Sequence, residues 1–413
     1  MMRTSRLLLA PLLVSAWVLG LGGISFYTPA LINIQHSLLL SSTLAKLTIS
    51  YFILGKAISM IAVAPVADYF KRRPLFIFGL SLFTLGSVVC LFAPGIRLLL
   101  FGRFIQGLGV SISILMGRAL VNDQFPPREA ANLFSIIFIG NALAITLLPI
   151  LAGYVSSISW RLLFLILSAY GLLTVVLFYY LLPEQRANDT AHPTLPFKAH
   201  LKHCLYGTRS ILAHPLFICF TLSLSLIDTG EKVLTTLSPF IFIDQLGLSS
   251  IHFGYLQGGF WCAHLLGLLL CSVLVLRLQL QTLVGLGVII CLVAAIMLLS
   301  AFFLPPIAIA LTTAALFIFM ISTGFIVPTS LVGLARPFRG QMGLATAIAM
   351  AIEFLMGFMM TAIVSHIKNH DTLLLTVTAI AVAIGLCICW PICASLREVC
   401  PKDSDHDSPR FQS

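Results

Sequence analysis

Residues 75–94 read LFIFGLSLFTLGSVVCLFAP, a stretch of 20 residues without a charged side chain. A helix of about 20 apolar residues is long enough to cross the hydrocarbon core of a bilayer. Similar stretches recur along the chain of 413 residues, of which 59% are hydrophobic and only 9% are charged. This composition excludes a cytoplasmic enzyme, a disordered chain and a collagen. Because the apolar stretches are continuous rather than alternating, an outer-membrane β-barrel is excluded as well.

Twelve such stretches can be separated at proline, glycine and charged residues. In the first half we expect spans near 7–28, 46–67, 75–94, 98–120, 131–155 and 162–182. In the second half we expect spans near 211–242, 251–276, 282–304, 306–332, 343–365 and 372–394. The first of these is about twice as long as the apolar core of a secretory signal peptide, so we interpret it as a span. The sequence therefore predicts an all-α membrane protein with twelve transmembrane helices in two pseudo-symmetric six-helix halves.

The expected organisation is an N-terminal half (1–182), a cytoplasmic central loop (183–210), a C-terminal half (211–394) and a cytoplasmic tail (395–413). The distribution of basic residues gives the orientation. With both termini in the cytoplasm, the opposite side carries only Lys46, Arg97, Arg161 and Lys368. This asymmetry follows the positive-inside rule, so we expect a multi-pass protein of a bacterial inner membrane with both termini cytoplasmic.

The net charge of +10 arises from Lys and Arg spread over short loops, so no nucleic-acid partner is expected. Most of the ten cysteines lie inside apolar stretches and form no visible disulfide framework. The spacing of Cys387, Cys389 and Cys393 places their thiols around a helix, so no metal site is predicted. We expect no cofactor, and the expected partners are a small-molecule substrate, protons and the lipid bilayer. The chain is expected to be a monomer.

Charged residues inside the spans are the candidates for function, because each costs free energy unless it faces a cavity or a partner. They are Lys56, Arg103, Arg118, Asp228, Glu231, Lys232 and Glu353. A carboxyl group held away from water can bind and release a proton near neutral pH. We therefore predict Asp228, Glu231 and Glu353 as proton-coupling residues. The alternatives are structural: Asp228 and Lys232 are spaced as an i, i+4 ion pair, and Glu353 can hydrogen-bond a neighbouring span.

The loop after the second span reads PVADYFKRRP over residues 65–74 and resembles motif A of the major facilitator superfamily. An acid at the end of one helix and bases at the start of the next can latch two helices by charge. With Asp123 at the end of the fourth span, Asp68 and Arg72 are the predicted conformational latch. The alternative is a positively charged cytoplasmic loop and nothing more. Lys71 and Arg72 depart from the motif, which commonly has a glycine there.

The fourth span contains RFIQGLG at residues 103–109 and resembles motif B of the same superfamily. Arg103, Gln106 and Gly107 share one helical face. We expect the cation and the amide to face a substrate cavity, and the glycine to permit close helix approach.

The fifth span partly resembles the antiporter motif, with Pro149 and Gly153 as expected helix-packing residues at the interface between halves. Together with LSPF at residues 237–240, these segments resemble the Bcr/CflA branch of drug:proton antiporters over most of the chain. The resemblance implies proton-coupled export of small amphiphilic molecules by alternating access. One departure is large: the family commonly has an acid before Tyr-x-Pro, and this chain has Ser25-Phe26-Tyr27-Thr28-Pro29. Proton coupling in this chain must then use Asp228, Glu231 or Glu353, or it does not work in the same way as in the family.

Tyr27, Lys232 and His264 complete the expected substrate contacts, although His264 also fits a hydrogen-bonded core histidine. The alternative function is a dedicated metabolite or siderophore carrier of the same fold, acting by export or uptake symport. Arg103, Lys56 and Lys232 would then suit an anionic solute. The loops contain no clustered catalytic set, so no enzymatic activity is expected.

Overall fold

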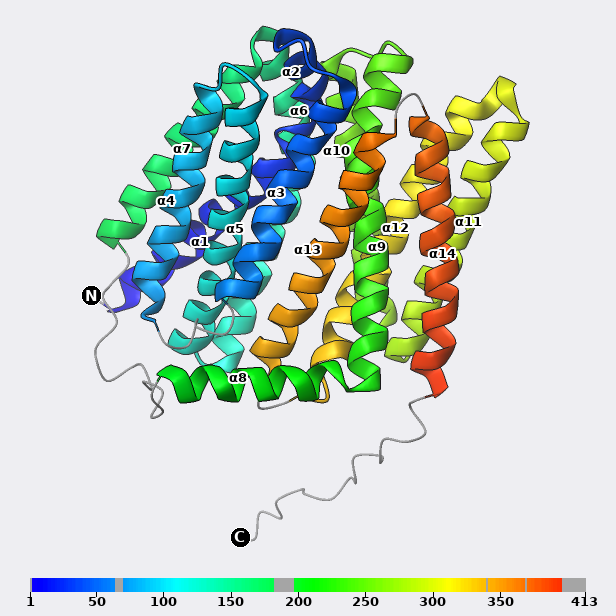
Figure 1. Ribbon diagram of the computed structural model, residues 1–413. Coiled ribbons are helices and arrows are strands. Elements are labelled where there is room, and N and C mark those ends of the chain that lie inside the picture. Colours follow the sequence, from blue (N-terminus) through cyan, green and yellow to red (C-terminus); the bar gives the residue numbers. More distant parts are fainter. Residues whose placement is uncertain (1, 64–69, 182–196, 339–340, 368–369, 396–413) are drawn as a thin grey trace.

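The computed structural model describes residues 2–63, 70–181, 197–338, 341–367 and 370–395, and the regular structure in these ranges is helical (Figure 1). The helices of the first half are α1 (Met2–Ser25), η1 (Thr28–Ala30), α2 (Leu31–Ser37), α3 (Ser42–Val63), α4 (Arg72–Leu91), α5 (Ile96–Gln124), α6 (Pro127–Ile158) and α7 (Trp160–Leu181). Those of the second half are α8 (Phe197–Leu212), α9 (Pro215–Pro239), the π-helical η2 (Phe240–Gln245), α10 (Ser250–Leu274), α11 (Leu280–Phe303), η3 (Pro305–Ile307), α12 (Ala308–Ala335), α13 (Met342–His366) and α14 (Asp371–Ser395).

The predicted membrane-helix bundle is confirmed. Among the described residues, 11 helical stretches are long and apolar enough to cross a membrane, and a bent pair, 206–212 with 215–245, brings the number to 12 if it is one span. The first span is longer than expected, because the chain continues beyond α1 through η1 and α2 to Ser37. Most other boundaries lie within about four residues of the expected ones.

The seventh span starts four residues later than expected. The chain bends by 78° between α8 and α9, so the span begins at Pro215 and not at residue 211. His214 has extended backbone angles (φ −82°, ψ 122°), since a residue before proline is disfavoured in the helical region. Within the expected central loop, α8 is helical and lies across one end of the bundle (Figure 1); residues 182–196 lie outside the described residues.

Each half repeats the same arrangement of helices. In the first half α5 packs against α3 and α4, and in the second half α12 packs against α10 and α11. Likewise, α4 contacts α7 as α11 contacts α14, and α1 contacts α6 as α9 contacts α13. These matching contacts relate the first six spans to the last six, as in transporters built from two repeated halves.

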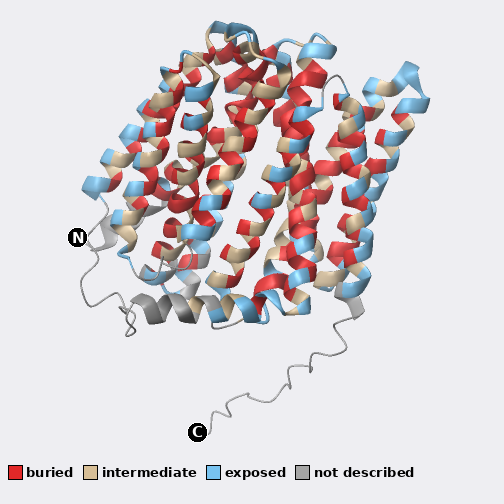
Figure 2. Ribbon diagram, in the orientation of Figure 1, coloured by how far each residue is buried: buried red, intermediate tan, exposed pale blue. Residues whose placement is uncertain are grey.

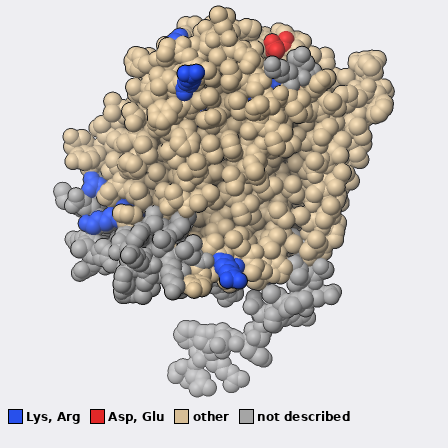
Figure 3. Space-filling view, in the orientation of Figure 1, with Lys and Arg blue, Asp and Glu red and all other residues tan. Residues whose placement is uncertain are grey.

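Each half also has its own core of buried apolar residues in the described part of the chain. Phe240, Ala351 and Phe354 of the second half join the core of the first. Figure 2 shows the buried residues on the inward faces of the helices and exposed ones outside, and Figure 3 shows a broad uncharged surface with Lys, Arg, Asp and Glu near its ends. An apolar outer belt of this kind fits a surface that contacts lipid.

Two helix pairs form most of the contact between the halves: α3 with α13, and α6 with α10. We call the end of the bundle where α6 ends and α10 begins the distal end. There, a Cβ on Gly153 would lie 2.6 Å from Ser250 O, and one on Gly254 would lie 2.5 Å from Pro149 O. Asn33 Nδ2 donates to Ser156 O at 2.9 Å in the same region. The backbones of α6 and α10 therefore approach closely through glycine.

Inside the first half, α3 and α5 cross at two glycines. A Cβ on Gly107 would lie 2.1 Å from Phe52 O, and one on Gly55 would lie 2.2 Å from Phe104 O. Real Cβ atoms do not approach a backbone oxygen so closely, so any larger residue forces the two helices apart. This contact gives Gly107 of the second motif a packing role within one half.

We expect Gly107→Ala to destabilise the protein by about 1–3 kcal/mol, because the new methyl group meets backbone and not a flexible side chain. Gly343→Ala is the matched control, since a Cβ there meets nothing within 4 Å. Denaturant unfolding of both variants in detergent measures the difference. Equal stability of the two variants would show that α3 and α5 are not in backbone contact at Gly107.

Candidate functional site

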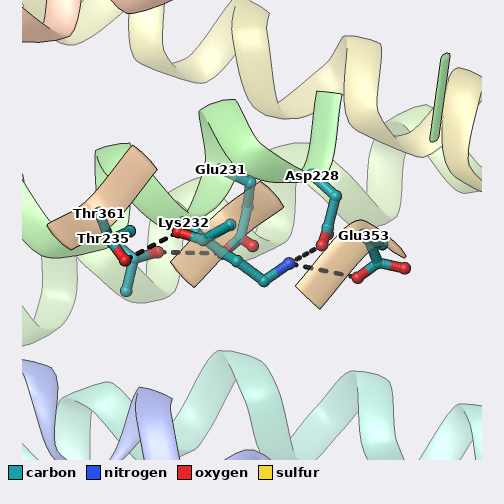
Figure 4. Close-up of polar contacts among 7 residues, drawn as sticks. Asp228, Glu231, Lys232, Thr235, Glu353 and Thr361 are labelled. Atoms are coloured by element: carbon teal, nitrogen blue, oxygen red, sulfur yellow. Dashed lines mark hydrogen bonds and ion pairs between the residues drawn. The ribbon is translucent and has the colours of Figure 1, made fainter. Parts of the chain in front are cut away.

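A group of charged side chains lies where the two halves meet, and Lys232 is at its centre. Lys232, on α9, is ion-paired with Asp228 one turn earlier, and its Nζ donates to Glu353 Oε1 on α13 at 3.2 Å (Figure 4). Lys232 is 4% exposed and Glu353 is 7% exposed. The i, i+4 pair that the sequence offered as the structural alternative is therefore present, and Glu353 from a distant span extends it.

Glu231 has a different set of neighbours. Thr235 Oγ1 donates to Glu231 Oε1 at 2.9 Å, as Figure 4 shows beside the Lys232 ion pairs. The Glu231 carboxylate also interacts electrostatically with Lys56 of α3 and with Glu353 of α13. The three acids predicted for proton coupling, Asp228, Glu231 and Glu353, thus lie in one charged group.

The first half contributes two bases to this group. Lys56 Nζ lies 3.9 Å from the centroid of the Phe354 ring, and the Arg118 guanidinium donates to Met350 Sδ at 3.7 Å. The Arg118 guanidinium also lies 5.5 Å from the centroid of the Trp17 ring. We call the six residues Lys56, Arg118, Asp228, Glu231, Lys232 and Glu353 the interface charge cluster. Its three bases and three acids come from α3, α5, α9 and α13.

Arg103 lies apart from this cluster, inside the first half, and is 0% exposed. Its guanidinium donates to Gly23 O (2.6 Å), Gln106 Oε1 (2.8 Å) and Thr48 O (3.4 Å). It also stacks between aromatic faces, 4.1 Å from the centroid of Tyr27. Among the described residues, no carboxylate pairs with Arg103.

The neighbours of Arg103 are hydrogen-bonded in turn. Gln106 Nε2 donates to Ser87 Oγ at 2.7 Å, and the Tyr27 hydroxyl bonds Thr48 Oγ1 at 2.6 Å. Gln106 and Tyr27 are both almost fully buried. In the conformation described, these three expected substrate contacts join α1, α3, α4 and α5 to one another and do not face solvent.

His264, the remaining expected contact, lies in the second half between α10 and α12. Its Nδ1 shares a hydrogen bond of 2.7 Å with Thr323 Oγ1, which itself donates to Met320 O. The Trp261 ring packs against it edge to face. Among the described residues, no group of three or more His, Cys, Asp or Glu side chains can hold a metal ion.

The predicted latch is described only in part. Arg72 Nε donates to Asp123 Oδ2 at 3.0 Å, which joins the start of α4 to the end of α5. Asp68 lies outside the described residues.

One ion pair was missed by the sequence reasoning. Lys46 of α3 is paired with Asp371 of α14, and both are buried, at 1% and 5% exposed. Lys46 Nζ also lies 4.7 Å from the centroid of the Phe240 ring. Each residue lies at the distal end of a span, where a charge ordinarily faces water, so only their spatial proximity reveals the pair.

Two six-helix halves with ionisable residues at their contact are the architecture of a secondary transporter. The chain belongs to the Major Facilitator Superfamily, whose family model matches residues 12–361.

Several characterised and uncharacterised transporters resemble this chain. An uncharacterized MFS-type transporter, YdgK of Bacillus subtilis, is 28% identical over 87% of this chain and 89% of its own length. The chloramphenicol resistance protein CraA of Acinetobacter baumannii is 25% identical over 69% of this chain and 68% of its own length. A bicyclomycin resistance protein homolog of Haemophilus influenzae is 24% identical over 56% of this chain and 58% of its own length.

Among solved structures, a bacterial homolog of the human lysosomal transporter Spinster, in an inward-facing and unoccupied conformation, has the same fold. Its TM-score is 0.72 at 16% identity, covering 97% of this chain and 99% of that one. The superfamily and the resemblance to the bicyclomycin-resistance branch are therefore confirmed, and the bundle is that of a multi-pass membrane transporter.

Removing one partner of the Lys46–Asp371 pair should destabilise the protein by about 3–5 kcal/mol, because it leaves the other charge buried and uncompensated. We expect Lys46→Met alone to show this loss, and Lys46→Met/Asp371→Leu to recover much of it. Denaturant unfolding in detergent gives the two values. A double variant no more stable than Lys46→Met would show that the loss of stability does not come from a buried charge left without its partner.

Proposed function

We propose that this chain is a proton-coupled exporter of small amphiphilic molecules, and that it carries its substrate unchanged. The observation that carries the proposal is the interface charge cluster, in which three acids lie beside bases of both halves. The relatives named for chloramphenicol and bicyclomycin resistance support export of drug-like molecules.

Asp228, Glu231 and Glu353 are the proposed proton sites. Burying an ionised carboxylate in an apolar interior costs free energy, which favours proton uptake. Nearby bases oppose proton uptake, because they stabilise the charged form of the carboxyl group. The first span contains no acid, and these three acids lie on α9 and α13, of which α13 packs against α3 of the first half. A proton bound in this place can act on both halves at once.

Transport is proposed to follow alternating access, in which the halves rock about this contact and expose it to each side in turn. The close α6–α10 contact and the Lys46–Asp371 pair hold the distal end together in the conformation described. A substrate contact by Tyr27, Arg103 or Gln106 then requires the hydrogen bonds around Arg103 to rearrange. Lys232 and His264 remain proposed contacts on the other half.

We further propose a bacterial inner membrane as the site of action, with α8 and both termini on the cytoplasmic side. Arg72 and Arg209 belong to the end of the bundle that carries α8, whereas Lys46, one of the few distal bases, is buried in an ion pair. This asymmetry supports the orientation through the positive-inside rule. We propose a monomer, in which one chain supplies both halves.

The test uses inside-out vesicles that hold an imposed pH gradient. We expect cationic or neutral drugs to dissipate the gradient with the unchanged protein, and Asp228→Asn/Glu231→Gln to reduce the response about tenfold or more. Asp244→Asn is the matched control, since this exposed acid follows α9 in η2.

The outcomes separate the candidates. A full drug response in Asp228→Asn/Glu231→Gln would remove these acids from the mechanism. Silence toward drugs with a response to a carboxylate metabolite would identify a dedicated carrier instead.

A further inference from the structure

The interface charge cluster is divided unequally between the halves. The first half supplies two bases, Lys56 of α3 and Arg118 of α5. The second half supplies one base and three acids, which are Lys232, Asp228, Glu231 and Glu353. When all are ionised, the first half carries two positive charges here and the second half a net charge of two negative. The halves therefore attract each other through this cluster.

The two bases of the first half reach α13 without forming an ion pair. Lys56 Nζ contacts the Phe354 ring at 3.9 Å, and Arg118 contacts Met350 Sδ at 3.7 Å. Among the described residues, neither base is ion-paired with a carboxylate. Their charges nevertheless act on the acids of the second half: Lys56 interacts with Glu353 and Glu231, and Arg118 interacts with Glu353.

Phe354 lies between bases of the two halves. Its ring is 3.9 Å from Lys56 Nζ and 5.2 Å from Lys232 Nζ, and the residue is 5% exposed. Lys56 also repels both Arg118 and Lys232. Glu353 and Glu231 offset this repulsion, while Asp228 is held by Lys232. Charged acids therefore favour the contact of α3 and α5 with α13, in addition to the apolar packing of Ala351 and Phe354 against the first half.

We propose that Lys56 and Arg118 are the groups through which proton binding at Glu231 and Glu353 alters the contact between the halves. The inference rests on the proposed function and names residues that it left unassigned. A proton on either acid removes an attraction toward the first half, while the repulsion of Lys56 by Arg118 and by Lys232 remains. The α3–α13 contact weakens, and the halves separate more readily at this level.

The readout is amide hydrogen exchange of α3, α5 and α13 in lipid nanodiscs, measured on both sides of neutral pH and corrected for intrinsic rates. We expect acid to increase exchange in these helices of the unchanged protein. Lys56→Met/Arg118→Met should reduce that increase about twofold or more, because fewer charges respond to the proton. Arg97→Met, which removes an exposed base from the start of the same α5, should leave the increase intact. Lys56→Arg/Arg118→Lys, which keeps both charges, should do so too.

Transport measurements supply the second readout. In vesicles, Lys56→Met/Arg118→Met should keep substrate counterflow without a pH gradient and lose proton-driven accumulation. The inference is overturned if the exchange difference in this variant equals that of the unchanged protein. It is also overturned if counterflow is lost together with accumulation and the charge-keeping variant restores neither, because the bases would then bind substrate or be needed for folding. A pH-dependent exchange change without any proton-driven flux would instead refute the proposed function and leave this inference standing.

Discussion

The rest of the structure depends on one constraint: charges taken into a membrane bundle must be neutralised inside it. A charged side chain at membrane depth costs several kcal/mol, by insertion scales about 3 kcal/mol, unless a partner or water compensates it. Lys46 and Asp371 neutralise each other across the two halves. In the interface charge cluster the ion pairs of Lys232 lie within the second half, with Lys56 of the first half close by. The contact between the halves therefore includes charged groups beside the close backbone packing of α6 against α10.

Packing within the first half depends on close backbone contacts, of the kind that also join α6 to α10. Glycines bring α3 and α5 into backbone contact, and the hydrogen bonds of Arg103 tie the same helices to α1. Such contacts change little without unfolding, because close-packed backbones have few alternative arrangements. Charged groups at the contact between the halves can instead become hydrated, and their carboxylates can be neutralised by proton binding. Close packing within the first half and charged groups at the contact between the halves suit rigid halves that move about a responsive interface.

The absence of an acid from the first span gives this arrangement its significance. In the resembled antiporter branch an acid commonly precedes Tyr-x-Pro, whereas Tyr27 here follows Ser25 and Phe26. Arg103 accordingly has aromatic and carbonyl neighbours. The ionisable groups are concentrated instead on α9 and α13. Asp228 lies one turn before Lys232 on α9, and Glu353 pairs with Lys232 from α13. The site of coupling proposed here belongs to the second half, with bases of the first half as its counterpart.

The sequence by itself determined the number and approximate ends of the spans and the two-half organisation, because length and apolar composition are local properties. Helical spacing also offered the i, i+4 pairing of Asp228 with Lys232 as an alternative to proton coupling. It also identified every member of the interface charge cluster as a charge within a span. The bend before Pro215 was signalled by that proline but overlooked. Only the tertiary structure decided which charges meet. Lys46 and Asp371 are 325 residues apart, and Lys232 and Glu353 are 121 apart, so their pairing follows from how whole helices pack and not from any local pattern.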